Sequence, residues 1–249
     1  EGPAIHLIAS IGSSMAQKLH LTRALTRTLL GCWVAAAVAG SFNAPIAGAL
    51  FAGEVVIGHY ALKSFAPVVI ASVAGTAVSR SYFGDYPAFL ISEHTIASLW
   101  ELISFAGLGL VAGIVAILFM RAIIVANAAG QKVPGPLFVR TTVGGIIIGL
   151  IAIAFPEVLG IGYGVTDMAL AASLSLGLMV AVGIMKIIAT AVSIGFTFGG
   201  GVFSPALVIG AMVGGGYGIV AGQLLPGFIS APGAYALVGM GAIAAAAIG

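Results

Sequence analysis

The chain has 249 residues, of which 61% are hydrophobic and only 6% are charged, and its formal net charge is +2. Soluble domains carry about 25% charged residues, so this chain has too few charges to cover a surface that faces water. The composition excludes an ordinary soluble protein and predicts an all-α integral membrane protein solvated mostly by lipid. The small net charge, without a basic run among aromatic residues, also argues against nucleic-acid binding.

Apolar stretches of helical length recur along the whole chain. Gly and Pro interrupt them, and several are shorter than the roughly 20 residues that span a bilayer. We therefore expect broken or tilted helices, whose ends are tolerated at membrane depth only when they are buried in protein or line a watery cavity. The predicted helices cover residues 4–18, 28–40, 44–58, 65–79, 96–128, 137–155, 168–194, 202–224 and 234–249.

The polar segments between these stretches are short. We expect loops at residues 80–89, 91–98, 130–136, 155–167 and 224–235. None of them is long enough to form a second soluble domain. Residues 1–249 are therefore predicted to form one membrane domain.

Three short motifs combine Gly or Pro with the start of an apolar stretch. They are Glu1-Gly2-Pro3, Gly40-Ser41-Phe42-Asn43-Ala44-Pro45 and Gly199-Gly200-Gly201-Val202-Phe203-Ser204-Pro205. Proline is well tolerated in the first turn of a helix, where its missing N–H has no intrahelical partner to lose. Each motif therefore predicts the start of a helix.

A helix start inside a membrane protein can hold an anion. Its first N–H groups have no intrahelical acceptor, and the helix dipole places partial positive charge there. In transporters built from discontinuous helices, such ends point toward anionic substrates near the midplane. The glycines at 199–201 also let main-chain amides approach a ligand closely.

These motifs resemble those of the CLC family of chloride channels and proton-coupled chloride transporters. Glu1-Gly2-Pro3 resembles the end of the family's Gly-x-Glu-Gly-Pro motif, and residues 42–51 (FNAPIAGALF) resemble its Phe-Asn-Ala-Pro segment. Gly201 to Pro205 (GVFSP) resembles its Gly-x-Phe-x-Pro motif. The resemblance implies a CLC-type fold with two inverted halves and chloride as the substrate.

The resemblance also implies roles for individual residues. Glu1 would be the gate, because its ionised carboxylate competes with chloride for the same pathway and its protonation opens that pathway. Val202 and Phe203 would bind the central anion, and Ser204 would line an outer position together with the first motif. The implied main-chain anion ligands are Glu1, Gly2, Gly201, Val202, Phe203 and Ser204.

One position departs from the pattern of the proton-coupled members. In those members the Phe-Asn-Ala-Pro segment is followed by two consecutive acids, and the second acid accepts the proton on the inner side. Here the corresponding pair is Glu54 and Val55. Valine cannot bind a proton, which favours channel-like conduction. Glu54 is a candidate proton relay, or alternatively an acid that pairs with Lys63 or faces water.

Two alternatives remain open. Within the family, the chain could be a chloride/proton antiporter that uses another inner proton route, whereas a fluoride-selective member is disfavoured by Pro3. Outside it, the chain could carry an organic solute or serve as a scaffold without transport. No enzyme motif, metal-ligand spacing or cofactor motif is present in the sequence.

The resemblance further implies the assembly and the location of the protein. Family members are homodimers with one pore in each subunit, so we expect a multi-pass homodimer in a cell membrane, most simply a bacterial inner membrane. The sequence lacks the family's upstream Gly-Ser-Gly-x-Pro motif and its last tyrosine. We therefore expect the 249 residues to be part of a longer CLC domain, without the first helices and the last two.

Overall fold

The structure is a computed structural model that describes residues 2–89, 98 and 101–248. Every regular element among these residues is helical, so the prediction of an all-α protein is confirmed. The chain divides into two compact units, an N-terminal unit at Glu1–Ala88 and a C-terminal unit at Phe89–Gly249.

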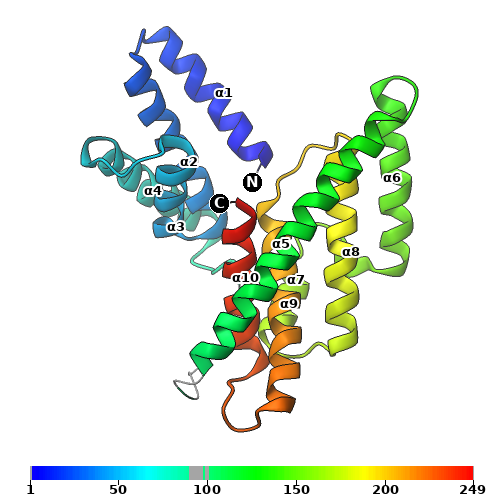
Figure 1. Cartoon of the computed structure of the whole chain (residues 1–249). Helices are drawn as coiled ribbons and strands as arrows, with labels where there is room; N and C mark the ends of the chain where they lie inside the picture. The colour runs from blue at the N-terminus through cyan, green and yellow to red at the C-terminus, as the bar shows by residue number, and fades with distance from the viewer. Residues whose placement is uncertain (1, 90–97, 99–100, 249) are drawn as a thin grey trace. The chain divides into compact units, whose positions relative to one another are not determined.

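The N-terminal unit is organised around helix α2. It contains α1 (Gly2–Lys18), α2 (Arg23–Phe42), α3 (Pro45–Phe51), a π-helix η1 (Ala52–Ile57) and α4 (Leu62–Phe83). Helix α2 packs against α1, α3 and α4 (Figure 1). The buried side chains of this unit come from α2, α3, η1 and α4, and they are Val34, Ala35, Val38, Ala49, Ala52, Ile57 and Val68.

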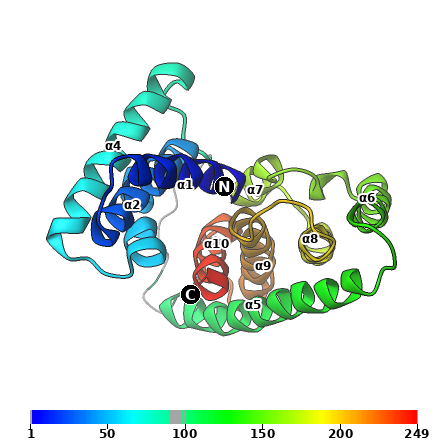
Figure 2. The same ribbon diagram turned by 90° about the horizontal axis from the view of Figure 1, so that it is seen from above.

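The C-terminal unit contains α5 (Glu101–Gln131), α6 (Leu137–Ala154), a 3-10 turn η2 (Pro156–Val158), α7 (Tyr163–Leu170), α8 (Leu176–Gly195), α9 (Phe203–Leu224) and α10 (Pro232–Ile248). Helix α9 is its central element, because it contacts α5, α7, α8 and α10. Figure 2 shows α5 running along one side of the row formed by α10, α9 and α8, with α6 beyond α8.

Glycines let α9 and α10 pack with their backbones in contact. A Cβ atom added at Gly210 would lie 2.6 Å from the Cα atom of Met240, and one at Gly218 would lie 3.0 Å from the Cα atom of Pro232. Between helices in lipid, where water does not drive association, such close approach supplies much of the attraction through dispersion. The glycine content of the chain therefore has a structural use at this crossing.

Most of the predicted helices are confirmed, but two expectations are wrong. The apolar stretch 168–194 is not one helix, because α7 ends at Leu170 and α8 begins only at Leu176. Between them Ala172 has a positive φ of 53°, and the Ser175 hydroxyl accepts a hydrogen bond from Leu178 N as the N-cap of α8. The turn and the N-cap therefore interrupt an apolar stretch that, by hydrophobicity alone, predicts one continuous helix.

Four of the expected loops are also shorter than predicted, and the fifth, at 91–98, lies outside the described residues except for Ser98. The segment 155–167 contains η2 and the first half of α7, and α4 continues to Phe83 inside the expected loop 80–89. Within the described part of the chain, six helices are long and apolar enough to cross a membrane by length and composition: α2, α4, α5, α6, α8 and α9. The chain is therefore a multi-pass membrane protein.

The contact between α9 and α10 generates a stability prediction. Gly210→Ala should destabilise the protein by about 1–3 kcal/mol, because the new methyl group overlaps the α10 backbone and the helices must separate. Gly222→Ala, in the same helix, is the matched control, since no atom lies within 4 Å of a Cβ there. Thermal unfolding in detergent should show a lower Tm for the first variant only. Equal Tm values would contradict the packing described here.

Candidate functional site

The connection from α8 to α9 begins with a tight helix end. Thr197 takes a positive φ of 68°, and Phe198 N donates a hydrogen bond of 2.9 Å to Ser193 O. This backbone geometry satisfies the last carbonyls of α8 without side chains. The chain then leaves α8 and continues into the glycines at 199–201.

Two of these glycines have open space around them. A Cβ atom at Gly199 or Gly200 would meet no atom within 4 Å, and neither residue has a positive φ. Neither packing nor backbone conformation therefore requires glycine at these two positions. What glycine does provide is an uncovered main chain that a ligand can approach.

Helix α9 begins immediately after the glycines. Val202 is its N-cap residue and offers no side-chain acceptor, and the backbone bond from Ala206 N to Val202 O measures 3.0 Å. Pro205 is the third helical residue, which confirms the prediction that this motif starts a helix. The main-chain N–H groups of the first turn therefore have no acceptor within the helix, and they lie at the positive end of the helix dipole.

The first turns of α9 are held in the interior of the C-terminal unit. Ser204 is only 7% exposed, and Ala206 and Ile209 are fully buried. Val202 packs against a cluster that includes Phe119 of α5 and Ile243 of α10. A helix start with no side-chain cap therefore lies among packed helices rather than on a lipid-facing surface.

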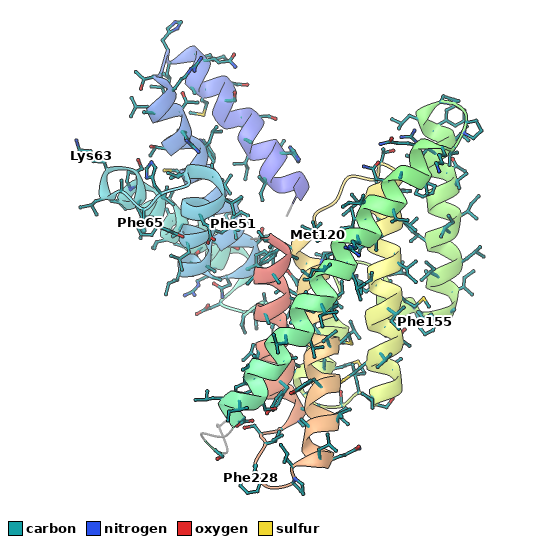
Figure 3. The ribbon with its side chains drawn as sticks, in the orientation of Figure 1. Phe51, Lys63, Phe65, Met120, Phe155 and Phe228 are labelled. Atoms are coloured by element: carbon teal, nitrogen blue, oxygen red, sulfur yellow. The ribbon has the colours of Figure 1, made fainter. Side chains whose placement is uncertain are left out.

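A buried lysine, which the sequence analysis did not single out, lies in the same unit. Lys186 of α8 is 3% exposed, and its Nζ donates hydrogen bonds of 2.8 Å to Val158 O and 2.9 Å to Gly160 O. Both acceptors belong to the connection between α6 and α7, which starts at Phe155 (Figure 3). The signal in the sequence is a single cation within the apolar run 176–195.

A buried acid was also missed. Glu101, the first residue of α5, is 1% exposed and accepts hydrogen bonds from Ser230 N at 2.7 Å and from Ser230 Oγ at 2.8 Å. Ser230 lies in the connection between α9 and α10. This carboxylate therefore ties α5 to the far end of α9, away from the helix start.

The second motif has a structural role in the N-terminal unit. Asn43 ends α2 with a positive φ of 53°, and its Nδ2 donates 2.9 Å to Asp85 Oδ1 and 3.0 Å to Tyr86 O. Arg80 Nε donates 2.7 Å to Asn43 Oδ1 and forms an ion pair of 3.1 Å with Asp85. Pro45 then starts α3, as predicted.

The candidate proton positions lie on the π-helix. Glu54 is exposed and Val55 is 53% exposed, and in the part of the chain that the structure describes Glu54 makes no ion pair with Lys63. Arg27 Nε of α2 donates 3.2 Å to Val56 O and thereby supports this segment. π-helical turns are rare and occur frequently at functional sites.

The predicted site residues are therefore brought together only in part. The structure joins Gly201, Val202, Phe203 and Ser204 at one helix start in the C-terminal unit. Gly2 is the first residue of α1 in the N-terminal unit, and Glu1 lies outside the described residues. The meeting of Glu1 with the start of α9 stays a prediction. Among residues 2–89, 98 and 101–248, no three His, Cys, Asp or Glu side chains gather as metal ligands.

Known proteins resemble this chain over its whole length. It is 36% identical over 250 residues to a putative ClcB-like chloride channel protein of Ralstonia nicotianae, and 30% identical over 255 residues to an H(+)/Cl(-) exchange transporter, ClcA, of Cronobacter sakazakii. The matches cover 99% and 100% of this chain, but only 58% and 55% of those relatives. The chain thus spans somewhat over half the length of the curated relatives it matches.

Solved structures share the fold. A slow cyanobacterial Cl-/H+ antiporter superposes with a TM-score of 0.86 at 25% sequence identity, covering 98% of this chain and 58% of that one. A CLC-type fluoride/proton antiporter superposes with a TM-score of 0.80 at 20% identity, covering 98% of this chain and 60% of that one. The expected CLC-type fold is confirmed. Because the profile described as "Voltage gated chloride channel" also matches residues 1–249, the chain belongs to the voltage-gated chloride channel family.

Proposed function

We propose that the protein transports chloride across a membrane and binds the anion with main-chain amides at the start of α9. The observation that carries the proposal is the start of α9 at Val202 and Phe203. It follows three glycines, its N-cap residue has no side-chain acceptor, and its first turns lead into the interior of the C-terminal unit at Ser204 and Ala206. Membership of the chloride channel family supports the same substrate. The ligands we propose at this helix start are the amides of Gly201, Val202, Phe203 and Ser204.

The physical reason is that a transported anion deep in a membrane protein needs surroundings of positive potential, and these must not bind it so tightly that it cannot be released. A helix start carries about half an elementary charge, and the interaction with an anion is worth up to about 2 kcal/mol in partly buried geometries. A full cation in direct contact would hold chloride more tightly and slow its release. Backbone amides therefore suit a site through which ions must pass.

We further propose that Glu1 gates the pathway, and that the main-chain amides of Glu1 and Gly2 line its outer part. An ionised carboxylate is itself an anion and competes with chloride for a site made of helix ends. Protonation removes that competition, and burial or a nearby anion alters how readily the proton binds. This part of the proposal rests on the resemblance of Glu1-Gly2-Pro3 to the family motif.

Two modes of transport are compatible with the family. The relatives include both a putative chloride channel protein and an H(+)/Cl(-) exchange transporter. We propose channel-like conduction, because Val55 stands where proton-coupled members carry an acid and cannot bind a proton. The alternative is proton-coupled antiport with Glu54 as the relay, which its exposed position on the π-helix permits.

We propose a homodimer in a bacterial inner membrane that needs no cofactor and is not an enzyme. A carrier for an organic solute, or a scaffold without transport, is the alternative from another class. Chloride efflux from liposomes that contain the protein expressed from its complete gene separates these classes, because neither alternative passes chloride.

The gate is tested by Glu1→Gln. In the unchanged protein, chloride efflux should fall as pH rises, because the carboxylate ionises and occupies the pathway. Glutamine cannot ionise, so efflux from liposomes with the variant should stay nearly constant with pH. Glu157→Gln is the control, since it makes the same chemical change on η2. A variant at Glu1 that keeps the normal pH dependence would show that Glu1 is not the gate.

The mode of transport is tested by the reversal potential. For channel-like conduction, the reversal potential should follow the chloride gradient and stay unchanged when a pH gradient is added, because no proton moves with the anion. Planar bilayer recordings at fixed chloride and varied pH make this measurement. A shift of the reversal potential with pH would establish coupling and favour antiport through Glu54.

The open backbone before α9 is tested by Gly200→Val. No atom lies within 4 Å of a Cβ atom at this position, so we expect the Tm to stay within about 2 °C, corresponding to a surface change of about 0.5 kcal/mol or less. Chloride efflux should nevertheless fall severalfold, because the side chain crowds the approach to the amides. Unchanged efflux at unchanged Tm would argue against an anion site at this helix start.

A further inference from the structure

The end of α9 that lies away from the helix start borders a cavity that the proposed function does not use. The cavity has a volume of about 540 Å³ and lies within the C-terminal unit, between the first turn of α5, the last turns of α9 and the connection from α9 to α10. Phe228, one of its lining residues, lies in that connection (Figure 3). Cavities of this size typically hold small-molecule ligands.

The least exposed part of the cavity wall is polar. Glu101 is 1% exposed, and Ser104 follows it by three residues, on the same face of α5. A Cβ atom added at Gly107, one turn further along α5, would lie 2.7 Å from the hydroxyl oxygen of Tyr217 in α9. Three oxygen-bearing side chains from two helices therefore line the same part of the cavity: Glu101, Ser104 and Tyr217.

The carboxylate of Glu101 is fixed in position by the connection from α9 to α10. Ser230 N donates 2.7 Å to Oε1, and Ser230 Oγ donates 2.8 Å to Oε2. Hydrogen bonds of this length are typical of bonds donated to an ionised carboxylate, which are stronger than those between neutral groups. The cavity therefore has a fixed negative charge in its polar wall, which attracts cations and repels anions.

The more exposed part of the cavity wall is apolar. Val220 and Leu224 of α9 are 41% and 74% exposed, and Phe228 is 55% exposed. Glu101 is the first residue of α5 and Leu224 is the last residue of α9, and both helices are long and apolar enough to cross a membrane. The cavity thus lies where these helices end, which is the level at which lipid head groups meet the hydrocarbon region.

We propose that this cavity binds a membrane lipid whose head group carries a primary ammonium, with an acyl chain of the lipid along the apolar wall. A primary ammonium combines a positive charge with three N–H donors. These match the Glu101 carboxylate and the hydroxyl oxygens of Ser104 and Tyr217. A head group without a cation lacks the charge, and a trimethylated ammonium lacks the N–H donors.

A purely structural role of Glu101 makes a different prediction. If its carboxylate only ties α5 to the α9–α10 connection, Glu101→Gln should lower the Tm and leave the preference among lipids unchanged. If the carboxylate also binds the ammonium, the variant should lose that preference. The preference among head groups, rather than stability, therefore separates the two roles.

The test uses the protein expressed from its complete gene, purified in detergent and titrated with lipids that have identical oleoyl chains. Native mass spectrometry gives the Kd for phosphatidylethanolamine, phosphatidylcholine and phosphatidylglycerol. Phosphatidylethanolamine should bind about tenfold more tightly than the other two, which is the order of one charge-assisted hydrogen bond. Glu101→Gln should remove most of this preference, whereas Glu157→Gln, the same change on η2 outside the cavity, should keep it.

A second variant tests the apolar wall and leaves the carboxylate in place. Val220→Trp fills part of the cavity, so the Kd for phosphatidylethanolamine should rise severalfold. Val180→Trp is the matched control, because Val180 is 52% exposed on α8 and does not line the cavity. Its Kd should equal that of the unchanged protein.

The outcomes are decisive in either direction. A Kd for phosphatidylethanolamine equal to that of either other lipid overturns the proposal, and so does a folded Glu101→Gln variant that keeps the preference. If Glu101→Gln does not fold, Val220→Trp decides: unchanged binding overturns the proposal, and weaker binding with a normal Val180→Trp control supports it. Lipid binding is measured without chloride transport, so the result stands whether or not the proposed function holds.

Discussion

The structure depends on one constraint, which is that no water is available inside a bilayer to satisfy backbone polar groups. A helix that starts within the membrane must therefore start inside protein. Helix α9 meets this condition, because Ser204, Ala206 and Ile209 are buried among neighbouring helices directly after an N-cap residue that has no side-chain acceptor. The constraint that makes such a helix start difficult to build also makes it useful, since its dipole acts in surroundings of low polarity.

Small residues make this arrangement possible. Gly210 and Gly218 of α9 allow α10 to approach within backbone contact, and Gly48 of α3 lies against the Ala35 carbonyl of α2 in the other unit. Tight contacts of this kind fix the positions of short helices that could not span a bilayer alone. The glycines before α9 serve a different purpose, because Gly199 and Gly200 face open space.

Polar side chains inside the two units act mainly on the backbone. Lys186 binds two carbonyls of the α6–α7 connection, Glu101 binds the amide of Ser230, and Asn43 binds the carbonyl of Tyr86. In each case the partner lies in a connection between α-helices rather than within an α-helix. Polar side chains inside a membrane protein need hydrogen-bond partners of this kind, and the backbone groups of irregular connections need hydrogen-bond partners as well.

The sequence by itself determined the membrane class, most helix positions and the helix starts at the second and third motifs, because composition, apolar runs and Gly or Pro motifs are local properties. It misjudged the run 168–194, since the break between α7 and α8 depends on Ser175 as a cap and on the turn at Ala172. Only the tertiary structure decided that α9 begins in a packed interior and that Lys186 lies beside it. The first fact follows from the packing of Val202 against a cluster that includes Phe119 and Ile243, and the second from the hydrogen bonds of Lys186 to the α6–α7 connection. These partners are distant in sequence and leave no periodic signal.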